Sequence, residues 1–183
     1  IFTVMEMLHR EQQLDILMLE KGPDLKDREC PMKTNPGSGC WNCENCSLVT
    51  GWGGAGAYSD GKLSLSSKIG GNLDKYIGKK KLEELIDYTD VIYLEFGAPD
   101  RIFGAADDKI KEIKEKAIKA NLKFIPAKLR HLGTGYTKTV LKNMKNYISS
   151  HNVDIKFGGN VVKFLVEDNQ VQGVKTASGT EYT

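Results

Sequence analysis

The chain has 183 residues, of which 40% are hydrophobic and 27% charged, as in an ordinary globular protein of one domain or one domain with an insertion. Its formal net charge of +2 argues against a nucleic-acid-binding role driven by bulk charge. No apolar run approaches the roughly 20 residues that a membrane span needs, and no signal peptide is recognisable, so we expect a cytoplasmic protein.

Residues 1–12 predict a helix, because Ile1, Val4, Met5 and Leu8 recur at helical spacing and form one apolar face. The segment has no N-cap and no start signal of its own. The first residue is also Ile rather than Met. We therefore expect a piece of a longer protein, or a mature or engineered product.

Residues 15–21 read DILMLEK and predict a strand buried on both faces of a parallel sheet. The strand ends in Glu20, and Gly22-Pro23 breaks it. A helix, a buried strand and a terminal acid form the second half of a dinucleotide-binding βαβ unit, in which the acid accepts hydrogen bonds from the ribose. A solvated strand-end carboxylate is an equally good interpretation of Glu20. The glycine fingerprint would lie before Ile1 and is absent.

Four cysteines fall in one polar, irregular stretch between residues 24 and 47. Clustering at two-residue gaps favours a metal or redox site over disulfides, since nothing else indicates secretion. The spacing resembles Fe–S ligation more than a zinc ribbon, although zinc, a Cys-x-x-Cys redox pair and four reduced thiols all remain open. The candidate ligands are Cys30, Cys40, Cys43 and Cys46.

Residues 51–65 read GWGGAGAYSDGKLSL and, after a short predicted strand at 48–52, form the most distinctive segment of the chain. Within residues 51–57, four glycines and two alanines leave the main chain nearly bare, so that a ligand can approach backbone N–H groups. Ser59 and Lys62 then add a hydroxyl donor and a positive charge. We interpret the segment as a cofactor-cradling loop; the alternative is a glycine-rich surface turn.

The rest of the chain predicts helices within 75–96 and 106–120, a strand at 124–130, a turn at 131–135 and a helix at 136–149. Leu82, Leu85 and Ile86 should face inward, and the lysines of the first two helices should lie on solvated faces. Strands follow at 153–157, 160–166 and 171–176, the last two joined by a tight turn. The fold class is therefore α/β, with residues 1–65 and 133–183 in one domain and a mostly helical insertion at 66–132.

The runs EKGPDLKDRECP, CWNCENC, GWGGAGAYSDGKL and RHLGTG together resemble the bacterial FAD-dependent dehydrogenases, a family of glutathione-reductase-like flavoproteins. The resemblance covers essentially the whole chain, which spans only the middle of the family's length. It implies an incomplete Rossmann-like FAD-binding domain with a β-meander, and an inserted substrate subdomain that covers the flavin.

The resemblance also implies roles for particular residues. Glu20 would bind the ribose of the FAD adenosine with Lys21 beside it, and Val161 would touch adenine through its backbone. Arg130 and His131 would be substrate contacts, or else exposed polar residues of a hinge. The remaining cofactor contacts, along the pyrophosphate and the flavin, would be Gly53, Gly54, Ala55, Gly56, Ser59, Asp60 and Lys62.

Three functions follow as hypotheses. The first is an FAD-dependent oxidoreductase, or a fragment of one, acting on a small-molecule substrate and binding neither nucleic acid nor membrane. The second is a cysteine-rich metal or Fe–S module without turnover, and the third a nucleotide-binding domain without redox activity. Because the family's first strand and helix N-terminus are missing, we expect this chain to bind FAD weakly or not at all. The open edge of the strand around Leu17 would also offer a pairing site for a second copy.

Overall fold

The structure is a computed structural model that describes residues 1–10 and 13–183, so the end of the predicted first helix lies outside the described residues. The chain divides into two compact units. Unit 1 comprises residues 1–58 and 141–183, and unit 2 comprises residues 59–140. The predicted division placed its boundaries at 65/66 and 132/133. The fold is mixed α/β, with one parallel pair of strands and two antiparallel sheets among the described residues.

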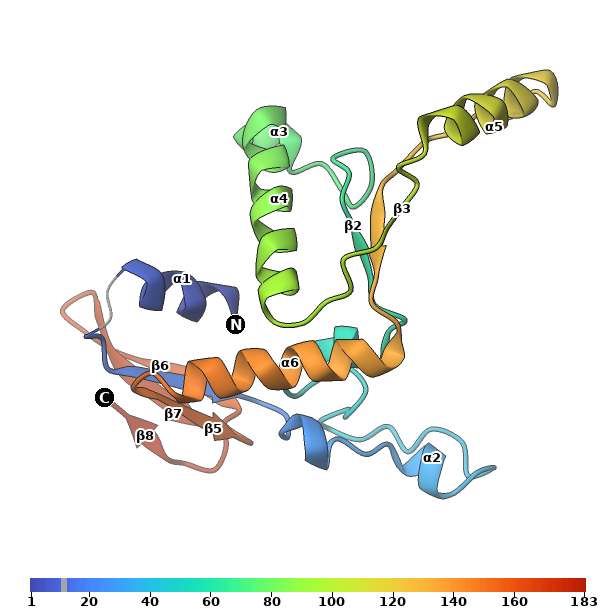
Figure 1. Cartoon of the computed structure of the whole chain (residues 1–183). Helices are drawn as coiled ribbons and strands as arrows, with labels where there is room; N and C mark the ends of the chain where they lie inside the picture. Colours follow the sequence, from blue (N-terminus) through green and yellow to red (C-terminus); the bar gives the residue numbers. More distant parts are fainter. Residues whose placement is uncertain (11–12) are drawn as a thin grey trace. The chain divides into compact units, whose positions relative to one another are not determined.

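In unit 1, β1 (Ile16–Glu20) pairs in parallel with β5 (Val153–Phe157), in a register that runs from Ile16 opposite Val153 to Glu20 opposite Phe157 (Figure 1). The predicted strand end at Glu20 is confirmed. Burial on both faces is wrong, because Leu17 is 41% exposed. Among the described residues β1 has one strand neighbour, so its other edge is unpaired.

Two helices supply most of the buried apolar residues of unit 1. The predicted helix at the start of the chain is α1 (Phe2–Arg10), and the predicted helix before the late strands is α6 (Thr134–Ser149). The boundary between the units falls inside α6. The buried residues recur at helical spacing, as the apolar pattern predicts. They are Val4, Met5 and Leu8 of α1 and Leu141, Met144 and Ile148 of α6; Val140 of α6 is also buried and belongs to unit 2.

The predicted β-meander is confirmed as β6 (Val161–Glu167), β7 (Gln170–Thr176) and β8 (Glu181–Tyr182), paired in that order and antiparallel. Asp168 and Asn169 both have positive φ, at 48° and 62°. A two-residue turn with positive φ at both positions matches the twist of a hairpin, which is why Asp and Asn are found there.

Unit 2 contains the helices α3 (Asp74–Ile77), α4 (Lys79–Glu95) and α5 (Asp107–Lys119). It also contains a small antiparallel sheet in the order β2 (Lys62–Ser64), β4 (Leu129–His131) and β3 (Ile102–Phe103). The predicted strand at 124–130 is therefore wrong for residues 124–128. In α4 the fully buried residue is Ile92, whereas Leu85, predicted to face inward, is 38% exposed.

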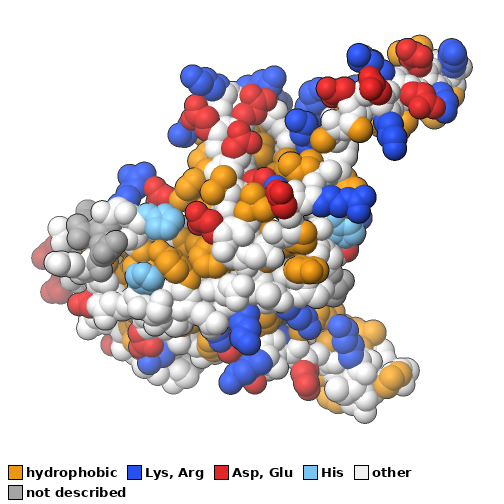
Figure 2. All heavy atoms as spheres, viewed as in Figure 1, with side chains coloured by type: hydrophobic (Ala, Val, Ile, Leu, Met, Phe, Trp, Pro, Cys, Tyr) orange, Lys and Arg blue, Asp and Glu red, His pale blue; other side chains and the backbone are white. Residues whose placement is uncertain are grey.

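The lysines of α4 and α5 lie on solvated helical faces, as predicted. Figure 2 shows acidic and basic side chains interspersed along these two helices. Exposed ion pairs one helical turn apart join Lys79 to Glu83 and Lys116 to Glu112. Such exposed pairs contribute little to stability, about 0.3–0.5 kcal/mol each. Among the described residues, none of the helices has the length and apolar character required to cross a bilayer.

Candidate nucleotide site

The carboxylate at the end of β1 touches the glycine-rich loop. Glu20 Oε1 accepts a hydrogen bond from the backbone N–H of Gly51 at 2.9 Å and another from Gly22 N–H at 2.8 Å. The two sites that the sequence singled out, 31 residues apart, therefore meet at the carboxyl end of the parallel pair. Ligands of open α/β sheets bind outside that end of the strands.

The loop reaches this position because its glycines pack closely against their surroundings. A Cβ on Gly22 would overlap the backbone at Gly51, and one on Gly53 would overlap the side chain of Leu141. Trp52 N–H donates to Pro23 O at 3.1 Å, while the indole Nε1 donates to Leu141 O of α6 at 2.8 Å. Gly22 and Gly53 therefore lack side chains because neighbouring protein atoms pack against them, and they leave no space for a ligand.

Two later glycines of the loop behave differently. Around Gly54 the nearest atom to an added Cβ is a backbone oxygen at 3.9 Å, and around Gly56 nothing lies within 4 Å. Both belong to the 3-10 helix η2 (Gly54–Tyr58), and residues 48–52 before it form turns rather than the predicted strand. Ala55 and Gly56 are exposed. The main chain at residues 54–56 is therefore the part of the loop that a ligand can approach.

Arg28 is a functional candidate that the sequence reasoning missed. Its side chain lies under the loop and is 4% exposed. Nε donates to Ser47 O at 2.9 Å, and Nη1 donates to Trp52 O at 2.7 Å and Gly54 O at 2.8 Å. Nη2 is buried with no hydrogen-bond partner among the described residues. Arg28 thus holds the loop through neutral carbonyl groups.

This arrangement leaves a buried cation without an ion-pair partner among the described residues. Burial lowers the pKa of Arg28, because removing the guanidinium from water disfavours its charged form. The Tyr58 hydroxyl donates to Arg28 O, and the tyrosine ring lies 4.8 Å from the Arg28 guanidinium. An anion lying on the glycine loop would therefore be attracted by a positive charge held beneath it.

A pocket of about 380 Å³ opens beside this loop at the carboxyl ends of β1 and β5. Its volume falls in the range of about 300–1,000 Å³ typical of small-molecule sites. The lining includes Lys21, which the resemblance placed beside the ribose. The full set of lining residues is Lys21, Gly22, Pro23, Asp24, Asp27, Asn45, Phe157 and Gly158. Val161, expected to contact adenine, begins β6 and does not line this pocket.

The structure does not bring the four cysteines into a ligand set. Cys40 and Cys43 are exposed, Cys30 and Cys46 are partly buried, and all four are free thiols. Within residues 1–10 and 13–183, no group of three or more His, Cys, Asp or Glu side chains is placed to hold a metal ion. Metal, cluster or redox chemistry at the cysteines stays a prediction from the spacing.

Three predicted cofactor residues belong to unit 2. Lys62 Nζ pairs with Asp60 Oδ2 at 2.6 Å, and this hydrogen bond lowers the pKa of Asp60. Ser59 Oγ accepts the N–H of Gly61 at 3.0 Å. All three side chains are exposed. Their polar groups therefore stabilise the turn that leads into β2, and their proposed flavin contacts remain predictions.

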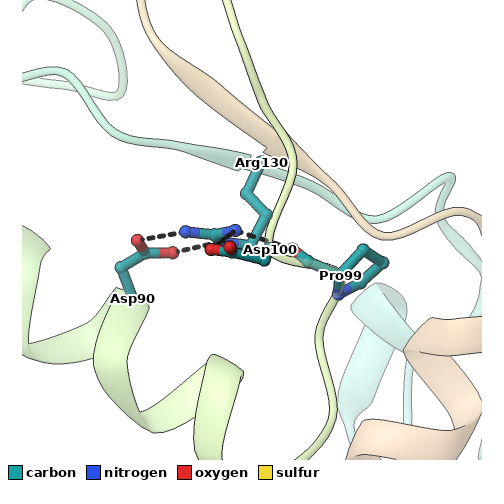
Figure 3. Close-up of polar contacts among 4 residues, drawn as sticks. All are labelled: Asp90, Pro99, Asp100 and Arg130. Carbon is teal, nitrogen blue, oxygen red and sulfur yellow. Dashed lines mark hydrogen bonds and ion pairs between the residues drawn. The ribbon is translucent and has the colours of Figure 1, made fainter.

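Arg130 has a structural environment that neither sequence interpretation anticipated (Figure 3). It is 1% exposed, so an exposed hinge residue is wrong. Its Nε and Nη2 donate to the two carboxylate oxygens of Asp90 at 2.6 and 2.7 Å, and Nη1 donates to Pro99 O at 2.6 Å. The bond to Asp90 raises the pKa of Arg130. Arg130 joins α4 to β4 and is not positioned as a substrate contact.

The neighbouring His131 is partly buried, and its ring lies edge-on to the ring of Phe103 at 6.2 Å between centroids.

A second pocket, of about 650 Å³, lies within unit 2 between the sheet and the helices α4 and α5. Charged residues of both signs line it, including Lys68, Lys128, Glu83 and Asp87.

Comparison of the chain with protein-family models and with curated proteins finds no match. The functional assignment therefore depends on the residues and geometry described above.

Proposed function

We propose that the chain is part of an FAD-dependent oxidoreductase, and that unit 1 binds the adenosine diphosphate half of the cofactor. The observation that carries the proposal is the 2.9 Å hydrogen bond between Glu20 Oε1 and Gly51 N–H at the carboxyl end of a parallel strand pair. It joins a strand-end acid, the residue type that binds the ribose in Rossmann-like folds, to a glycine-rich loop that follows it in the chain.

The residues of unit 1 fit such a cofactor in three respects. Glu20 Oε2 would accept a ribose hydroxyl while Oε1 keeps the loop in place. The accessible main chain at Gly54 and Gly56 would lie along the pyrophosphate. The buried guanidinium of Arg28, which feels the charge of Glu20 but forms no ion pair within 4.0 Å among the described residues, would balance the phosphate charge from below.

When bound, FAD supplies the electron transfer itself, and the protein contributes binding, orientation and electrostatics. Lys62 would lie near the flavin and favour its anionic reduced form. We assign the substrate to unit 2, which carries the larger pocket. The roles of Lys62 and of unit 2 are proposed from the resemblance of the sequence to FAD-dependent dehydrogenases.

Equilibrium dialysis of the chain against FAD tests the proposal. The sequence leaves weak binding and no binding open; because unit 1 keeps the acid and the loop together, we expect weak binding, with a Kd on the order of 0.1 mM. Glu20→Gln should weaken it about tenfold, because an NH2 group, which only donates, replaces the Oε2 that would accept the ribose hydroxyl. Gln keeps an oxygen for the Gly51 N–H, so the loop is preserved.

Glu29→Gln is the matched control, since Glu29 is an exposed carboxylate nearby in the sequence. It should leave FAD binding unchanged. No binding at millimolar FAD, or equal losses in the two variants, would contradict the proposal.

A further inference from the structure

One residue that lines the pocket at the strand ends has an unused hydrogen-bond acceptor. Asn45 lines the pocket, and its Oδ1 is buried with no hydrogen-bond partner among the described residues. A buried oxygen that no donor reaches lowers the stability of the fold, because the loss of its hydration is not compensated. A bound ligand with an N–H group would supply that donor.

We propose that Asn45 recognises the adenine base of the bound nucleotide by accepting a hydrogen bond from its exocyclic amine. The inference rests on the proposed function and adds to it the residue that selects the base. Neither the resemblance nor the glycine loop accounts for Asn45, which lies between Cys43 and Cys46.

The charges around the pocket favour a base over a phosphate. Asp24 and Asp27 line the wall together with Lys21, so the pocket has no excess positive charge that would attract a phosphate. Both carboxylate oxygens of Asp24 already have partners within the protein, because Oδ1 accepts Leu25 N–H at 2.7 Å and Oδ2 pairs with Lys145 Nζ at 2.6 Å. The phosphates belong instead on the loop above Arg28. A neutral ring with an amine donor suits the interior of the pocket.

The same pocket has an aromatic wall that suits a planar base. Phe157 ends β5 and lines the pocket, and its ring lies edge-on to Trp52 at 6.4 Å between centroids, with Lys145 Nζ over one face at 5.8 Å from the centroid. Stacking of a base on the other face would stabilise binding without distinguishing one base from another. Selection then falls to Asn45.

Backbone and side-chain contacts fix the segment that carries Asn45. Arg28 Nε donates to Ser47 O at 2.9 Å, and this bond connects the two ends of the segment that contains Cys30 and Cys46. Cys46 O accepts the N–H groups of Val49 and Thr50 at 3.0 and 2.9 Å. A site that holds its acceptor rigidly discriminates strongly against ligands that lack the donor.

Isothermal titration of the whole chain with ADP and with IDP tests this proposal, because the two differ where the amine of adenine is replaced by a carbonyl. We expect ADP to bind about tenfold more tightly than IDP, a difference of about 1.4 kcal/mol. Asn45→Ala should lower ADP affinity to the IDP level and leave IDP affinity unchanged. Asn45→Asp keeps the acceptor and should keep the preference for ADP.

Asn35→Ala, at an exposed position of the same segment, is the control and should bind both nucleotides as the wild type does. Equal binding of ADP and IDP by the wild type would overturn the role of Asn45 and leave nucleotide binding intact. An equal loss of both ligands in Asn45→Ala would do the same. If neither nucleotide binds the wild type, the proposed function fails as well. Glu20→Gln should weaken both nucleotides alike.

Discussion

At the scale of single residues, the glycines of the turn at Gly22 and of the loop at residues 51–56 have two different structural roles. Gly22 and Gly53 are required because neighbouring atoms occupy the space of a side chain. Gly56 has open space around it. The first kind fixes the loop on the end of β1, and the second kind leaves main chain accessible to a ligand.

Gly22→Ala should lower the free energy of unfolding by about 1–3 kcal/mol, because its Cβ would overlap the backbone at Gly51 and push the loop away from Glu20. Urea unfolding measures the difference. Gly56→Ala is the matched control and should change stability by less than about 0.5 kcal/mol. Equal stabilities of the two variants would show that the close approach at Gly22 does not constrain the loop.

The site residues that could be predicted were those with a local sequence signal. Glu20 follows an apolar strand directly, and the glycine loop is compositionally distinct. Arg28 and Asn45 have no such signal. The role of Arg28 depends on its hydrogen bonds to Trp52 and Gly54, and the role of Asn45 depends on its place in the pocket at the strand ends. Arg130 was misjudged for the same reason, since its partner Asp90 lies 40 residues away.

At the scale of secondary-structure elements, the pair Arg130–Asp90 connects α4 to β4 within unit 2. The pair is almost completely shielded from water on the arginine side, and both guanidinium–carboxylate bonds are short. Breaking a buried pair by removing one partner is strongly destabilising, because the remaining charge stays buried.

Asp90→Ala should therefore destabilise the protein by about 3 kcal/mol or more. Asp100→Ala is the control, because Asp100 is 99% exposed and its carboxylate lies 3.9 Å from Arg130 Nη1. It should change stability by less than about 1 kcal/mol. Thermal unfolding followed by circular dichroism distinguishes the two. A similar small effect of both variants would show that Arg130 is not held by Asp90.

Elements with regular apolar patterns were predicted well, whereas two short mixed segments were predicted wrongly. The pattern of α6 and the alternation of the β-meander gave both the type and the approximate bounds of these elements. The apolar residues at 48–52 and 124–128 suggested strands, but the first segment forms turns around Arg28, and β4 begins only at Leu129. Periodicity cannot decide such short runs, since contacts distant in sequence determine them.

At the scale of the whole molecule, the division into units separates the two proposed tasks. The acid, the accessible glycines, Arg28 and the pocket with Asn45 all belong to unit 1. The larger charged pocket belongs to unit 2. Nucleotide binding should therefore affect one unit, and this separation can be measured residue by residue.

The most direct measurement is a ¹H–¹⁵N correlation spectrum of the chain recorded during titration with ADP. We expect the perturbed amides to cluster at Lys21 and Gly22, at residues 51–56 and at Gly158, since these line the strand ends and the loop. Absence of any shift at millimolar ADP, or shifts confined to residues around the unit 2 pocket, would contradict the account.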